Sequence, residues 1–229
     1  MKKTIVIIFS FVMLVSFVFA QQIDTLKDQR DGRVYKTVQI GDQVWMAENL
    51  NTSVFTDGTK ISEVASAFNW SDLNTGAWSW YGNNSFNGDV YGRLYNWYAV
   101  MGIHDLESKT NIVLRKKICP IGWHVPSDEE WLALAKYLGK NAGHKLKSAG
   151  WLNSKGTAKN SSGFNALPGG YRDLIGGFED LENDSYWWSA TEYDNGFAWN
   201  RSLFYDSGSF TRYVVSNVYG YSVRCLKDK

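Results

Sequence analysis

The chain has 229 residues, in which 24 lysines and arginines nearly balance 23 aspartates and glutamates. This length allows one domain with a sizeable core or two small ones, and the eleven tryptophans indicate an ordered globular protein. The balanced charge argues against binding to nucleic acid, which favours clustered lysine and arginine. It also argues against electrostatic attachment to a membrane surface.

The first twenty residues have the composition of a secretory signal peptide. Met1-Lys2-Lys3 is basic, residues 4–19 are almost wholly apolar, and the small residue Ala20 allows cleavage before Gln21. The alternative, a membrane anchor, is disfavoured because this run is shorter than the ~20 residues that span a bilayer and no stop-transfer charges follow it. We therefore expect a secreted or periplasmic protein that does not insert into the membrane after cleavage.

The first predicted element after this segment is a β-hairpin over residues 33–50. Its apolar residues alternate with polar ones in the order Val34, Val38, Ile40, and the pair Gly41-Asp42 is typical of a two-residue turn. Residues 51–90 are rich in asparagine, serine, glycine and tryptophan, which predicts long ordered loops.

Two short helices are predicted next. In residues 91–103 the apolar positions Leu94, Trp97, Tyr98 and Met101 share one helical face. The second helix, over residues 126–139, has the stronger pattern: Ser127 and Glu130 form a capping box, and Gly139 provides a left-handed stop. Its predicted buried stripe is Trp131, Leu134, Ala135 and Leu138.

No further helix is predicted after Gly139. The segments WWSATE, FAWNRSLFY, TRYVV and GYSVRCLK instead predict short strands, separated by Asp-Asn-Gly and Asp-Ser-Gly turns.

The two cysteines, Cys119 and Cys225, predict one disulfide bond, because an even, isolated pair in an exported protein is usually oxidised. Free thiols are the alternative. A redox or metal pair is disfavoured, since neither cysteine belongs to a C-x-x-C motif and no histidine has ligand spacing to both.

Six motifs carry a resemblance to one known family. They are, in chain order, DGRVYKTVQIGDQVWMAENL, YGRLYNWYAV, CPIGWHVPSDEEW, SGFNALPGGYR, WWSATE and GYSVRCLKD. Over residues 31–228 the chain resembles the Fibrobacter succinogenes major paralogous domain family, which leaves residues 21–30 as an N-terminal extension. The resemblance implies a secreted or surface protein of the kind found in Bacteroidetes and Fibrobacteres, in a family whose function is largely unassigned.

A more distant resemblance, to the formylglycine-generating-enzyme branch of the C-type-lectin-like fold, implies the architecture. We expect an α+β protein with two short helices, small antiparallel sheets, long ordered loops and paired N- and C-terminal strands. A Cys119–Cys225 disulfide fits this arrangement, because it would join the terminal strand to the segment that enters the second helix. The glycines at 169, 170, 176 and 177 would serve tight turns and close backbone approach. Trp187 and Trp188 would be structural rather than contact a ligand, and because adjacent strand residues point to opposite faces, one should pack in the core and the other against the covering loops.

The catalytic residues of enzymes with this fold are not found. Residues 199–206, which match the segment that carries reactive thiols in formylglycine generation, contain no cysteine. The sulfoxide synthases use three clustered histidines, whereas His104, His124 and His144 lack such spacing. We therefore expect no catalytic residues, no cofactor and no bound metal. The acidic loop of Glu179, Asp180, Glu182 and Asp184 leaves Ca²⁺ open as an alternative, but a solvated loop is favoured.

The function that these observations favour is a secreted, non-catalytic binding or surface-interaction module for a glycan or a protein. The residues expected to contact the ligand from the loop face are Tyr193, Asp194, Asn195, Tyr205 and Arg212. Two alternatives remain: an enzyme of the formylglycine-generating or sulfoxide-synthase type, and a structural component of the cell envelope.

Overall fold

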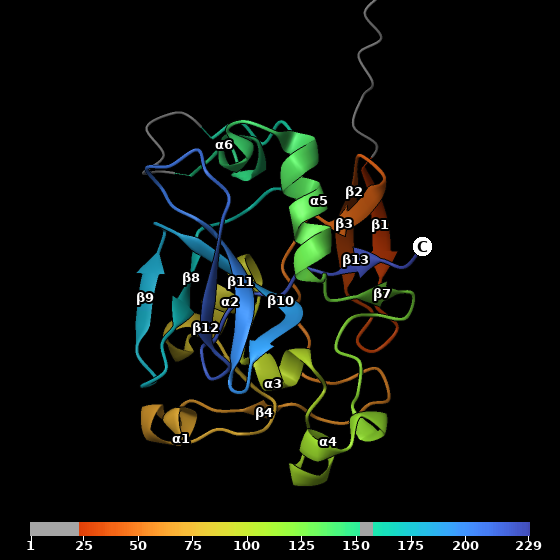
Figure 1. The fold of residues 1–229 in the computed structure, drawn as a ribbon, viewed down its shortest axis with the longest axis vertical. Coiled ribbons are helices and arrows are strands. Elements are labelled where there is room, and N and C mark those ends of the chain that lie inside the picture. The colour runs from red at the N-terminus through yellow and green to blue at the C-terminus, as the bar shows by residue number, and fades with distance from the viewer. Residues whose placement is uncertain (1–22, 152–157) are drawn as a thin grey trace, which may run out of the picture.

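The computed structural model describes residues 23–151 and 158–229, which form an α+β fold with three sheets (Figure 1). The predicted signal peptide and its cleavage point lie outside these residues. Within the described ranges no helix is both long and apolar enough to cross a membrane.

The first sheet contains the predicted hairpin. Its strands, in spatial order, are β1 (Ile23–Lys27), β2 (Val34–Ile40), β3 (Gln43–Met46), β13 (Leu226–Lys227) and β7 (Trp123–His124). The turn between β2 and β3 falls at Gly41-Asp42 as predicted, with φ of +61° at Gly41. The segment taken as an N-terminal extension supplies β1, which pairs with β2 over five residues.

The second sheet holds the predicted C-terminal strands. Its spatial order is β12 (Thr211–Ser216), β11 (Phe197–Leu203), β10 (Ser185–Asp194), β8 (Gly169–Arg172) and β9 (Phe178–Leu181). β10, β11 and β12 are antiparallel neighbours, whereas β8 runs parallel to β10. A third, small sheet consists of β4 (Ser62–Glu63), β5 (Ala77–Ser79) and β6 (Leu94–Tyr95).

The described residues form more helices than the two predicted. They are α1 (Ala67–Ser71), α2 (Ser85–Tyr91), α3 (Trp97–Val100), α4 (Leu106–Thr110), α5 (Asp128–Leu138) and α6 (Ala142–Leu146), with 3₁₀ turns η1 (Tyr81–Asn83) and η2 (Ile112–Leu114). The prediction of loops alone over residues 51–90 was therefore wrong, since α1, α2, β4 and β5 lie there. Apart from α5, these helices are at most seven residues long, too short for a clear apolar period.

Helix α5 is the central element of the fold and lies between the two five-stranded sheets (Figure 1). The predicted capping box is present: Ser127 accepts the backbone N–H of Glu130, and the Glu130 carboxylate accepts the backbone N–H of Ser127. The buried face consists of Trp131, Leu134 and Leu138, while Ala135 is half-buried. This face packs on Val38, Ile40 and Trp45 of the first sheet and on Trp187 and Leu203 of the second.

The cysteines form the predicted disulfide. Cys119 and Cys225 lie 106 residues apart in the sequence and are bonded, with a Cα–Cα distance of 5.9 Å. The bond joins the segment that leads into β7 and α5 to the segment that enters β13.

Two details of the expected architecture differ in the structure. The first and last strands share a sheet, but β13 lies between β3 and β7 rather than beside β1. The helix predicted over residues 91–103 is divided, because Leu94 and Tyr95 pair with β5 before α3 begins at Trp97. A tertiary partner for the backbone of Leu94 thus overrides the local helical pattern.

Candidate binding surface

Two of the predicted ligand-contacting residues come together in the second sheet. The exposed ring of Tyr193, at the end of β10, packs edge-on against Trp199 of β11 with 5.2 Å between ring centroids. The guanidinium of Arg212, on β12, lies 4.2 Å above the ring of Trp199. Strand alternation and pairing place these side chains on one face of the sheet, and stacked aromatic and guanidinium groups attract one another.

A buried carboxylate fixes this arrangement from below. Asp128, the first residue of α5, forms ion pairs with both Arg201 and Arg212, and its Oδ1 lies 2.6 Å from Nη2 of Arg201. Arg201 is almost fully buried and is paired across the strands with Arg212. Burial lowers the pKa of the Arg201 guanidinium, an effect that attraction by Asp128 opposes. We call Tyr193, Trp199, Arg201, Arg212 and Asp128 the Trp199 cluster; with two guanidiniums and one carboxylate, it carries a surplus positive charge.

The other predicted site residues lie apart from this cluster or at its margin. Asp194 and Asn195 form the exposed tip of the β10–β11 hairpin, where the Asp194 carboxylate accepts the N–H of Asn195. Tyr205 follows the opposite end of β11, roughly 20 Å from the tip at the usual rise of a strand. Its backbone N–H donates to the carboxylate of Asp184. The five residues therefore do not form one site.

The opposite face of the same sheet carries a second group of rings, which we call the tyrosine platform. Its members are Tyr171, Tyr186, Phe204, Tyr213, Tyr219 and Tyr221. Tyr186 and Tyr221 are buried and stacked, whereas Tyr213 is 48% exposed and the remaining rings are half-buried. The platform joins strands β8, β10 and β12 to the segment that precedes β13.

Two carboxylates accompany the platform. The hydroxyl of Tyr186 donates to Asp180 at 2.6 Å and, at 3.4 Å, to Asp184. Burial and the nearby negative charge of Asp180 raise the pKa of Tyr171 to about 12. Burial also raises the pKa of Asp184. The acidic loop is therefore partly built into the sheet rather than wholly solvated.

The described residues contain no group of three or more histidine, cysteine, aspartate or glutamate side chains that could hold a metal ion. Two of the histidines are engaged at separate places: His104 contacts Asp105 at 3.1 Å, and His124 bridges Glu130 and Asp228 at 3.0 and 2.6 Å.

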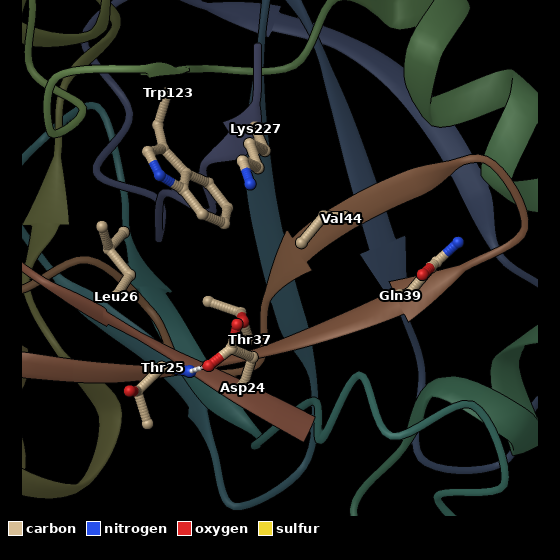
Figure 2. A pocket seen from close by; sticks show the side chains of 8 residues that line it. All are labelled: Asp24, Thr25, Leu26, Thr37, Gln39, Val44, Trp123 and Lys227. Atoms are coloured by element: carbon tan, nitrogen blue, oxygen red, sulfur yellow. Dashed lines mark hydrogen bonds between the residues drawn. The ribbon is translucent and has the colours of Figure 1, made fainter. Parts of the chain in front are cut away.

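A polar hollow of about 270 Å³ opens on the first sheet, on the face turned away from α5. Figure 2 shows Trp123 and Lys227 on one side of the hollow and Asp24 and Thr37 on the other. Binding pockets for small molecules usually start at about 300 Å³, so this hollow is small for an independent ligand site. It lies on a different sheet from the Trp199 cluster.

Comparison with known proteins gives one match. Residues 38–227 match the model of the Fibrobacter succinogenes major domain. The chain belongs to this family. No curated protein and no solved structure matches it significantly. The Fibrobacter succinogenes major domain thus spans nearly all of the described fold, from within β2 to the end of β13, and contains both the Trp199 cluster and the tyrosine platform.

Three residues of the Trp199 cluster were not singled out from the sequence. In FAWNRSLFY, strand alternation puts Trp199 and Arg201 on the same face, so that signal was available. The role of Asp128 was hidden, because an acidic residue in the first turn of a helix is already explained by the helix dipole. Its pairing with strands 73 and 84 residues further along the chain depends on the fold.

Proposed function

We propose that this protein is a non-catalytic binding module of the cell exterior that recognises glycans through the Trp199 cluster. The observation that carries the proposal is the stack of Tyr193, Trp199 and Arg212, held in place by a buried carboxylate. Aromatic rings bind the C–H faces of sugars, and a guanidinium binds hydroxyl or carboxylate oxygens in a fork geometry.

The position of the cluster supports binding rather than a purely structural role. Tyr193 is 59% exposed and the Arg212 side chain is 45% exposed, although both are ordered by contacts beneath them. Tyrosine, tryptophan and arginine are also the residues that dominate binding energy at interfaces. Because strands rather than loops present them, little conformational freedom is lost on binding.

The charge of the cluster suggests which glycans bind best. Asp128 neutralises only one of the two arginines that it contacts. A sugar that bears a carboxylate would supply a second anion beside Arg212. We therefore expect acidic glycans to bind more tightly than neutral ones. Added salt should reduce this difference in affinity, because it screens the charges.

A glycan array tests the proposal. The wild-type protein should bind a subset enriched in acidic glycans, and Tyr193→Ala and Arg212→Lys should each weaken the best of these interactions about tenfold. Phe86→Ala is the matched control, since Phe86 is 79% exposed on α2, away from the cluster. If the array is silent, or if all three variants bind like the wild type, the proposal is wrong.

A further inference from the structure

The tyrosine platform has no part in the proposed function, because it lies on the other face of the sheet. Its ring centroids follow one another at 4.8 to 6.2 Å, from Tyr213 through Phe204 and Tyr186 to Tyr171 and then Tyr219. The rings at both ends of this row reach solvent, whereas Tyr186 within the row and Tyr221 stacked on it are buried. The platform is thus an elongated row of rings rather than an enclosed cage.

Negatively charged side chains lie next to the Tyr186 and Tyr171 part of this row, whereas near Phe204 the ammonium of Lys147 donates to that residue's backbone carbonyl. Asp180 has a left-handed φ of +63°, and its Oδ2 accepts the Tyr186 hydroxyl at 2.6 Å. Glu179, the neighbouring residue on β9, is exposed. Burial raises the pKa of Tyr171, Tyr186 and Tyr221, and the negative charge of Asp180 raises the pKa of each of them further. Carboxylates therefore surround the middle of the row, at Tyr171 and Tyr186.

A ligand that fits these features carries positive charge and flat apolar faces. Protonated amines are attracted both to the faces of tyrosine rings and to carboxylates. The elongated row suits an oligosaccharide, whose successive sugar rings can contact successive aromatic rings, better than a single compact ammonium group. We infer that the tyrosine platform is a second binding site, specific for glycans built from amino sugars with free amine groups.

Isothermal titration with two matched tetrasaccharides tests this inference. At mildly acidic pH the tetramer of glucosamine should bind, and the tetramer of N-acetylglucosamine, which has the same rings without the charge, should bind about tenfold more weakly. Asp180→Asn should remove most of this preference, because it deletes one charge while asparagine tolerates the left-handed backbone. Asp42→Asn, in the hairpin turn of the first sheet, removes an equal charge elsewhere and should leave binding unchanged.

Tyr213→Ala provides a second variant that does not depend on Asp180, since its half-exposed ring can be removed with little effect on folding. It should weaken binding of the glucosamine tetramer severalfold. Binding to the acidic glycans of the array, which depends on the Trp199 cluster, should not change. Equal binding of the two tetramers would overturn the inference, as would tighter binding of tetralysine, which would indicate a basic protein partner. Because the two sites use different ligands and variants, either can fail without the other.

Discussion

Gly170 allows strands β8 and β9 of the second sheet to lie close together, because it has no side chain. Its φ is +61°, and a Cβ placed there would lie 2.4 Å from the carbonyl oxygen of Glu179 and 2.8 Å from the backbone nitrogen of Leu181. Both atoms belong to β9, so they cannot move without disturbing its pairing with β8. The sequence predicted a structural role for this glycine, and the structure supplies its cause.

Gly170→Ala should therefore lower the free energy of unfolding by more than the strain of a left-handed alanine alone would. Gly196 is the control, because its φ is +88° but a Cβ there would meet nothing within 4 Å. We expect Gly196→Ala to lower the free energy of unfolding by about 1–2 kcal/mol, and Gly170→Ala by at least about 1 kcal/mol more. Urea denaturation measures both; equal losses would show that the contact with β9 relaxes freely.

At the scale of elements, the buried face of α5 connects the two five-stranded sheets. Trp131 is fully buried, with its ring centroid 4.5 Å from that of Trp45 and 6.5 Å from that of Trp187. Trp131→Ala should lower the free energy of unfolding by about 3–5 kcal/mol, because a cavity would open between both sheets. Leu132→Ala, on the exposed side of the same turn, should stay within about 0.5 kcal/mol. A loss below about 1 kcal/mol for Trp131→Ala would contradict this packing.

How well each element could be predicted depends on where its partners lie in the sequence. Helix α5 carries its cap, its stop and its apolar stripe within residues 127–139, so local reasoning located it. The division between β6 and α3 depends on Tyr95, whose backbone pairs with Tyr221, a contact that no local pattern reveals. The Trp199 cluster is similar: alternation could assign a face to each of its strand residues, but not the helix that supplies Asp128.

Trp187 and Trp188 illustrate the same limit within one strand. Adjacent strand residues point to opposite faces, which led us to expect one tryptophan in the core and the other against the covering loops. Both are fully buried, because each face of β10 has its own core: Trp187 packs with Trp131 and Phe164, and Trp188 with Tyr221. The sequence predicted that the pair is structural, but a second core could not be seen without the sheet topology.

At the scale of the whole molecule, the disulfide is the longest-range covalent constraint among the described residues. Its loop of 106 residues restricts the unfolded chain by about 4–5 kcal/mol in the chain-entropy model. We expect the double variant Cys119→Ala, Cys225→Ala to lose about that amount of stability in urea, and the wild type under reducing conditions to lose a similar amount. Two alkylatable thiols in the native, non-reduced protein would contradict the bond itself.

The place of β13 within the first sheet also dictates the order in which the protein can fold. β13 lies between β3 and β7, so β3, near the start of the chain, lacks one neighbour until residues 226–227 are available. A chain emerging from the ribosome therefore cannot complete this sheet until residues 226–227 have been added. Such long-range pairing makes folding slow, because the entropy of closing a long loop is lost before the contact between β13 and β3 is made.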